Sequence, residues 1–315
     1  MIIGIVSGII AAFAGFVIAP AFALLMHLTR HWNIQDFDLM SRQRLENSQY
    51  APYLNRILSD IAYMRGLSYE NVTVRSFDGA ALSAKLTGNG DRLMILAHGF
   101  HTTPLNNFAT LARTYLNPGY SVLLIDERGH GASAGHTTMG LKEERDMLCW
   151  ADWAQQDGRF TAFAMHGISM GGAALIMASD RINRPKLKAL VCDCAYYSLN
   201  MQMATVKQMR SLPARIVAPF MKLFMRLIYG EDSRKDGLEA LKNSTVPILF
   251  LAGGQDSVVT AGTIKAACEA CAGNGRYILV PGAKHTLTGI AGGDDVRGQL
   301  IDFLEKQFEK RSTTA

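Results

Sequence analysis

Several features that would assign this chain to a common class of protein are missing from its sequence. The 315 residues include five cysteines, at positions 149, 192, 194, 268 and 271, and their odd number gives no sign of a disulfide framework. Cys268 and Cys271 form one Cys-x-x-Cys pair, but no second pair or histidine cluster accompanies it, so we predict buried free thiols rather than a zinc site. No basic cluster is interleaved with aromatic residues, so nucleic acid is not an expected partner.

Charge is also missing from the beginning of the chain, because Ile2 to Met26 contains no charged residue. A helix of this length would cross a hydrocarbon core of about 30 Å. A cleaved signal peptide is the alternative, with Ala21-Phe22-Ala23 as its cleavage site, but the positively charged region that precedes such peptides is absent. We therefore predict a single-pass anchor over residues 1–28 and a membrane localisation. Three arginines follow the segment, Arg30, Arg42 and Arg44, so the positive-inside rule favours a cytoplasmic body. Because the charges are so few, both orientations stay open.

The remaining chain divides into a polar, amphipathic connector over residues 29–70 and an α/β domain over residues 71–315. Two strands joined by an Asp-Gly turn predict a hairpin near Asn71–Ser76 and Leu82–Thr87. Apolar strand patterns then alternate with helical patterns, which favours a mostly parallel, doubly wound sheet. Strands are predicted near residues 93–97, 121–125, 160–165, 187–192, 246–251 and 276–280. Helices are predicted near residues 105–116, 141–156, 170–179, 260–270 and 296–311.

One segment interrupts this alternation and predicts a helical cap insertion over about residues 195–243. It has no strand pattern, and it contains five methionines and five basic residues between Met201 and Arg226. Methionine side chains suit a pocket for flexible acyl chains, but they would equally pack the insertion onto the body. A third alternative places the basic, apolar stretch from Ala214 to Tyr229 against anionic lipid.

The clearest chemical signal is Gly167-Ile168-Ser169-Met170-Gly171, which lies between an apolar run, Phe160 to Met165, and a helical pattern. A Gly-x-Ser-x-Gly sequence between a strand and a helix predicts a nucleophile elbow, in which a sharp turn exposes the serine hydroxyl. We expect Ser169 to be the nucleophile. The backbone N–H of Met170, at the start of the helix, is then placed to bind an oxyanion.

A serine nucleophile needs a histidine base and an acid that orients it. Of the eight histidines, only His285 follows a late strand, and its loop opens at the same edge of a parallel sheet as Ser169. Asp256 follows the preceding strand, and Asp193 is the reserve candidate for the acid. In His98-Gly99-Phe100, after the first strand of the alternating pattern, the Phe100 N–H is the second predicted oxyanion donor.

These residues resemble motifs of the α/β-hydrolase superfamily. The likeness covers about Asn71 to Lys310, and within the superfamily the chain is most similar to bacterial serine aminopeptidase-like and lysophospholipase-like hydrolases with an N-terminal membrane segment. The resemblance implies a serine hydrolase with Ser169, Asp256 and His285 as its triad and no metal or organic cofactor. One departure is Ile168, where related sequences often carry a polar or bulky residue. The matching motifs are His98-Gly99-Phe100, Asp126-x-Arg128-Gly129-His130-Gly131-x-Ser133, Gly167-x-Ser169-x-Gly171-Gly172, Gly253-x-x-Asp256 and His285.

The predicted activity is hydrolysis of a small-molecule carboxylic ester, of a hydrophobic or acyl-lipid kind, through an acyl-enzyme on Ser169. A serine peptidase acting on short peptides is an alternative, and it would need an acidic pocket for the substrate amine. A second alternative is a non-catalytic, membrane-tethered binding protein, but such proteins usually lack a member of the triad, and none is missing here. The resemblance does not identify the substrate.

Overall fold

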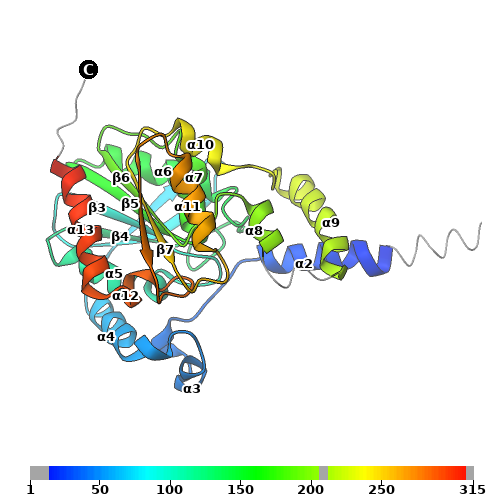
Figure 1. Cartoon of the computed structure of the whole chain (residues 1–315), viewed down its shortest axis with the longest axis horizontal. Helices are drawn as coiled ribbons and strands as arrows, with labels where there is room; N and C mark the ends of the chain where they lie inside the picture. Colours follow the sequence, from blue (N-terminus) through cyan, green and yellow to red (C-terminus); the bar gives the residue numbers. More distant parts are fainter. Residues whose placement is uncertain (1–13, 206–211, 310–315) are drawn as a thin grey trace, which may run out of the picture.

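One eight-stranded sheet organises the part of the chain that the computed structural model describes, residues 14–205 and 212–309 (Figure 1). The strands lie in the order β1-β2-β4-β3-β5-β6-β7-β8. The β1–β2 and β2–β4 pairs are antiparallel, and all the other neighbours are parallel. The strands span β1 (Glu70–Arg75), β2 (Ala81–Thr87), β3 (Arg92–Ala97), β4 (Ser121–Ile125), β5 (Ala162–Ile168), β6 (Leu187–Asp193), β7 (Ile248–Gly253) and β8 (Gly275–Val280).

Helices cover both faces of this sheet, because its parallel strands are apolar on both sides. In β3, Leu93 and Ile95 belong to the same core cluster as residues of α6, α7, α10 and α11, whereas Met94 and Leu96 belong to the cluster with residues of α4, α5 and α13. The helices of the first face span α6 (Glu143–Gln156), α7 (Met170–Ala178), α10 (Gly237–Asn243) and α11 (Ala261–Ala270). Those of the second face span α4 (Leu54–Arg65), α5 (Pro104–Leu116) and α13 (Gly293–Glu309), and the short α12 (Thr288–Ala291) precedes α13.

The α/β architecture agrees with the prediction from the sequence, and most strand bounds differ from the predicted ones by one or two residues. The strand before Ser169 is the clearest difference. It was predicted near residues 160–165, whereas β5 spans Ala162–Ile168 and stays extended up to the serine. Long-range pairing explains the shift, because Gly167 and Ile168 lie in register with Cys192 and Asp193 of β6.

The predicted anchor over residues 1–28 is not supported by the structure. Residues 1–13 of that segment lie outside the described residues. The described part continues as η1 (Ala14–Ile18) and α2 (Ala19–Thr29). Within residues 14–205 and 212–309, no helix combines the length and the apolar character that a membrane crossing requires.

The helical insertion does not fold onto the sheet along its whole length. Its first two helices are α8 (Leu199–Thr205) and α9 (Leu212–Tyr229), and α10 returns to the body. In Figure 1, α9 extends away from the sheet and lies beside α2. The rings of Phe22 and Phe224 make an edge-to-face contact between these helices at 5.5 Å. Because Leu25 of α2 and Met225 of α9 are also buried, we describe the two helices together as the α2–α9 arm.

The connector between α2 and β1 wraps around the edge of the body that carries the carboxyl ends of the strands. It contains η2 (Phe37–Leu39), α3 (Arg42–Glu46), η3 (Ala51–Tyr53) and α4. Its first residues are fixed by the loop after β4. The Trp32 N–H donates to the Gly129 carbonyl at 2.7 Å, and the Trp32 carbonyl accepts from the Gly131 N–H at 3.2 Å. This wrapping brings residues 33–50 over the site described next.

Candidate active site

Ser169 stands at a sharp turn between β5 and α7, as the glycine pattern predicts. Its backbone has φ 52° and ψ −110°, which is a strained combination for a residue with a side chain. The turn is held by a hydrogen bond from Ser169 N–H to the Asp193 carbonyl at 2.8 Å. A Cβ atom on Gly171 would lie 2.2 Å from the Ala97 carbonyl oxygen, so only glycine lets the turn lie this close to β3. Strain and close packing thus hold the hydroxyl at the sheet edge.

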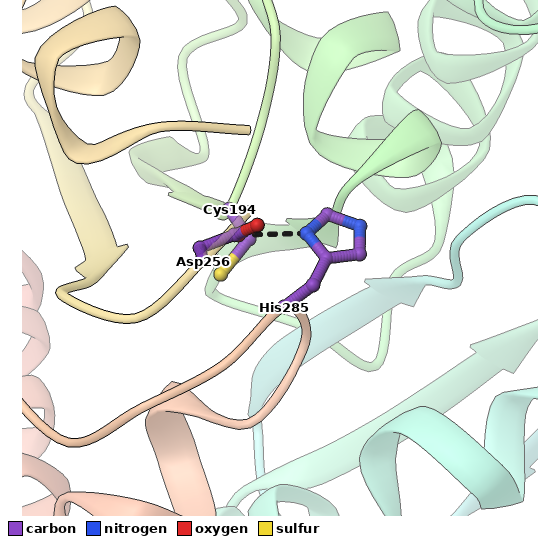
Figure 2. A group of neighbouring side chains, drawn as sticks. All are labelled: Cys194, Asp256 and His285. Carbon is purple, nitrogen blue, oxygen red and sulfur yellow. Dashed lines mark hydrogen bonds and ion pairs between the residues drawn. The ribbon is translucent and has the colours of Figure 1, made fainter. Parts of the chain in front are cut away.

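The structure brings Ser169, His285 and Asp256 together in a continuous hydrogen-bonded series. His285 Nε2 is 3.0 Å from Ser169 Oγ, and His285 Nδ1 is 2.7 Å from Asp256 Oδ2. Figure 2 shows the second of these contacts, with the aspartate on the loop after β7 and the histidine on the loop after β8. The Asp256 side chain is fully buried and that of His285 is 16% exposed.

Asp256 is oriented by its own loop. Its other carboxylate oxygen, Oδ1, accepts hydrogen bonds from the backbone N–H groups of Val258 at 2.8 Å and Val259 at 2.9 Å. Oδ2 is therefore the oxygen that faces the imidazole. The reserve candidate, Asp193, does not contact His285, because its Oδ2 accepts a hydrogen bond from the Thr288 hydroxyl. The geometry thus favours Asp256 as the partner of the histidine.

Cys194 lies against the same pair of side chains, a proximity that the sequence did not predict (Figure 2). Its sulfur lies within 4.8 Å of the facing atoms of Asp256 and His285, a spacing compatible with a metal ion. Burial, reinforced by the charge of Asp193, raises the pKa of the Cys194 thiol well above its usual value, so the sulfur stays protonated. The Asp256 carboxylate bonds to the His285 imidazole, and Cys194 forms part of the buried surroundings of that pair.

The loop after β3 carries the predicted second oxyanion donor and lies directly beside the serine. A Cβ atom on Gly99 would lie 3.4 Å from the Ser169 Cβ. Gly99 N–H donates to Asn107 Oδ1 at 2.8 Å, and His101 N–H donates to His130 Nε2 at 3.1 Å. Between these anchored neighbours, Phe100 N–H has no hydrogen-bond acceptor among the described residues, and the same is true of Met170 N–H. Both predicted donors are therefore free to bind a ligand.

Two buried histidines, both neutral, hold this loop in place. His98 Nε2 accepts from Glu127 N–H at 3.0 Å, so its proton resides on Nδ1, which donates to the Gly99 carbonyl at 2.7 Å. Burial, with a contribution from His130, lowers the pKa of His98 to about 3. Burial likewise lowers the pKa of His130 to about 4, and its ring is 5.1 Å from that of His98. These two side chains are structural supports of the loop rather than alternative bases.

The glycine-rich stretch after β4 is organised around Arg128, which is almost fully buried. Its guanidinium makes a two-pronged ion pair with Asp146, at 2.6 and 2.7 Å, and a further one with Asp78 at 3.0 Å. These contacts hold the pKa of the Asp78 carboxyl well below its usual range, against the opposing effect of burial. The stretch is thus an internally bonded turn that positions His130.

Ser169 and His285 open into a pocket of about 620 Å³. Residues 33–50 of the connector form one wall, and residues 99–102 with Asn106 and Asn107 form the other. The connector is tied to the base itself, because Gln49 Nε2 donates to the His285 carbonyl oxygen at 3.0 Å. No local pattern in the sequence predicts this contact between positions so far apart in the chain.

The methionine-rich insertion lines a different pocket. This second pocket, of about 930 Å³, is lined by residues of the 197–203, 215–222 and 234–238 segments and includes neither Ser169 nor His285. Although it is larger, it contains no candidate nucleophile, so the smaller pocket is the candidate site. Within the described residues, the insertion therefore packs against α2 and the body instead of covering the serine.

The chain is similar to one protein family and to two uncharacterized proteins. The profile of the family described as serine aminopeptidase, S33, matches residues 88–235. The chain is 22% identical over 216 residues to the uncharacterized protein YqkD of Bacillus subtilis, covering 67% of this chain and 70% of that protein. It is 28% identical over 221 residues to the uncharacterized protein Rv2307c of Mycobacterium tuberculosis, covering 68% of this chain and 72% of that protein.

Solved structures share the architecture. The Pyrococcus furiosus esterase Pf2001 superimposes with a TM-score of 0.64 at 21% identity, covering 79% of this chain and 94% of the esterase. Est1E of Butyrivibrio proteoclasticus, solved with ferulic acid bound, superimposes with a TM-score of 0.60 at 20% identity, covering 76% of this chain and all of Est1E. The fold described above is thus the α/β-hydrolase fold.

Proposed function

We propose that this chain, a hydrolase with the α/β-hydrolase fold, cleaves carboxylic esters through an acyl-enzyme on Ser169. The observation that carries the proposal is the series Ser169 Oγ, His285 and Asp256, joined at 3.0 and 2.7 Å at the floor of an open pocket. A strained serine that lines a pocket, with a histidine in hydrogen-bond reach, is the arrangement that activates a hydroxyl for attack on a carbonyl carbon.

Each step of the reaction has a group in place. His285 takes the proton of Ser169 as Oγ bonds to the ester carbon, and Asp256 stabilises the imidazolium that forms. The N–H groups of Phe100 and Met170 bind the oxyanion, and one such donor is typically worth about 3 kcal/mol of barrier. The intermediate collapses and expels the alcohol, which takes the proton from His285. Water, deprotonated by His285, then attacks the acyl-enzyme, and Ser169 is released with the carboxylic acid.

The pocket favours an apolar ester over a peptide with a free amino terminus. Apolar side chains line the connector wall, among them Ile34, Phe37, Met40 and Leu45. Within the described residues, no Asp or Glu side chain lines this pocket, so a substrate ammonium group would lack a carboxylate partner. Ester hydrolysis is therefore the better supported activity, and peptide hydrolysis is the alternative that the same experiment examines.

Labelling with a fluorophosphonate probe, followed by a substrate panel, tests the proposal. The wild-type protein should be labelled, and Ser169→Ala and His285→Ala should not, while thermal melting shows that both variants fold. Nitrophenyl esters with acyl chains of two to sixteen carbons should be hydrolysed with a preference for the longer chains, whereas short peptide amides should not. A folded wild-type protein that resists the probe would instead support the non-catalytic binding protein.

We also propose that the chain associates with membranes through its N-terminal segment and the α2–α9 arm. Supporting this, the charge-free sequence continues into η1 and α2, and Phe16 is 83% and Leu227 70% exposed. Basic residues on α9, such as Lys222 and Arg226, would complement anionic lipid. Flotation of the full chain with anionic vesicles should recover it in the lipid fraction, and alkaline carbonate should release it only if it lies on the surface. Recovery in the soluble fraction under both conditions would refute the association.

A further inference from the structure

Arg44 is a charged residue in an otherwise uncharged part of the active-site pocket. It belongs to α3, which forms part of the connector wall, and it shares this pocket with Ser169 and His285. Within the described residues, the lining contains no other Lys or Arg and no Asp or Glu. A guanidinium placed in such a pocket attracts negative charge, and its planar set of N–H donors matches a carboxylate or phosphate.

The acidic residues near Arg44 are already occupied by other partners. Asp36 and Asp38 both bind Arg65, at 2.8 and 2.6 Å, and Glu46 binds Arg42 at 2.7 Å. Arg44 itself forms no ion pair among the described residues. These three carboxylates are thus paired with Arg65 or Arg42, and Arg44 is left without an acidic partner in the described part of the chain.

The surroundings of the pocket increase this positive potential. His101, which lines the pocket, contacts Trp32 with a ring separation of 4.1 Å. The guanidinium of Arg30 lies over the Trp32 ring, 4.2 Å from its centre. Burial lowers the pKa of His101, and the charges of Arg30 and Arg44 lower it further, so this imidazole stays neutral beside them. The charges of two arginines therefore act on His101, a residue of the pocket lining, and that lining contains no opposing Asp or Glu among the described residues.

We propose that Arg44 binds an anionic group of the substrate, so that the preferred substrates are esters that carry a carboxylate or a phosphate away from the scissile bond. This inference rests on the proposed ester hydrolysis and specifies its substrate class. The apolar wall would contact the hydrocarbon part of such an ester, and Arg44 would fix its charged end. Binding energy gained away from the reacting carbon would then hold the ester carbonyl in the oxyanion site.

Matched pairs of esters that differ in charge test the proposal. Nitrophenyl pentanoate and nitrophenyl hemiglutarate have acyl chains of equal length, but only the second carries a carboxylate. A monoacylglycerol and its phosphate ester form the corresponding pair for phosphate. In the wild type, kcat/KM should be higher for the charged member of at least one pair, and this advantage should decrease as NaCl is added. The pair that shows the advantage identifies the anion.

The decisive measurement is the ratio of kcat/KM for the charged ester to that for its neutral partner. Arg44→Ala should lower this ratio about tenfold, Arg44→Lys should restore part of it, and Arg44→Glu should invert the preference. Arg42→Ala is the control, because Arg42 lies on the same helix, is paired with Glu46 and does not line the pocket. It should keep the wild-type ratio.

Three results would overturn the proposal or separate it from the proposed function. A wild-type ratio near one, or an equal loss on both esters in Arg44→Ala, would show that Arg44 has no role in substrate charge. If the probe labels Ser169 but no ester is hydrolysed, the proposed function fails. In that case glutarate should still slow probe labelling of the wild type and not of Arg44→Ala; equal slowing in both proteins would refute the anion site as well.

Discussion

Replacing Asp256 with asparagine would keep the shape of the site, remove the carboxylate charge and change which nitrogen of the His285 imidazole carries the proton. The structure fixes how the new amide must lie. Oδ1 accepts two backbone N–H groups, from Val258 and Val259, so the amide oxygen of asparagine would have to take that place. The amide NH2 would then face His285 Nδ1, where the carboxylate oxygen now lies at 2.7 Å. As a donor, it forces the imidazole to carry its proton on Nε2, the nitrogen that should accept the proton of Ser169.

The expected loss is large because the base is present but in the wrong tautomer. The same replacement in the triad of a serine protease lowers kcat by about 10⁴-fold, and we expect a loss of that order here. This factor corresponds to about 5.4 kcal/mol of activation free energy. KM should change much less, because Asp256 does not line the pocket and the replacement preserves both volume and the two backbone hydrogen bonds.

The assay is steady-state hydrolysis of a nitrophenyl ester, with thermal melting to show that the variant remains folded. Asp193→Asn is the matched control, since Asp193 is also buried and ends the neighbouring strand, and its amide oxygen would still accept from Thr288. It should lose far less activity. Our reasoning would be refuted if Asp256→Asn retained at least a tenth of the wild-type kcat, or if the two variants lost the same amount.

Two further predictions concern the support of the site. Gly171→Ala would place a Cβ atom 2.2 Å from the Ala97 carbonyl oxygen, so it should destabilise the fold by about 3 kcal/mol or more. Gly158→Ala is the control, because a Cβ atom there would have nothing within 4 Å, and it should not destabilise the fold. Comparable melting temperatures of the two variants would contradict this. Glu127→Gln should stabilise the protein increasingly from pH 5 to pH 8. Burial and the nearby acids raise the pKa of Glu127 well above its usual value. The folded state therefore retains a proton that the unfolded state loses above about pH 4.5. This difference lowers the free energy of unfolding of the wild type by up to about 1.4 kcal/mol per pH unit. A difference in melting temperature that is independent of pH would contradict it.

The fold could be predicted from the sequence because its signals are local. Most strands of the parallel sheet are apolar runs followed by a loop with glycine, and the helices have their own period. The elbow was predictable for the same reason, since strand, Ser169 and helix are consecutive. The choice of Asp256 over Asp193 was a weaker prediction, because both acids end neighbouring strands. The structure shows Asp256 beside His285, and its catalytic role stays a prediction that the asparagine variant examines.

The pocket could not be predicted, because its wall and its floor come from distant parts of the chain. Gln49 and His285 are joined by a hydrogen bond across 236 positions, and no local pattern indicates such a contact. The methionines of the insertion were equally ambiguous. Met225 is buried with Leu25 of α2, a pairing between two helices that the sequence presents as unrelated segments. Long-range packing, rather than local propensity, decided where each segment lies.

The position of the connector wall has a consequence for how such an enzyme would change over time. The reacting groups lie on loops after β5, β7 and β8, whereas much of the surface that would select the substrate lies in residues 33–50, before the first strand. Under the proposed function, the reacting groups and much of the substrate-selecting surface would therefore be encoded by separate stretches of the gene. Substitutions in the leading stretch can retarget the enzyme with little risk to the sheet, and relatives with the same triad but different leading sequences should accept different esters.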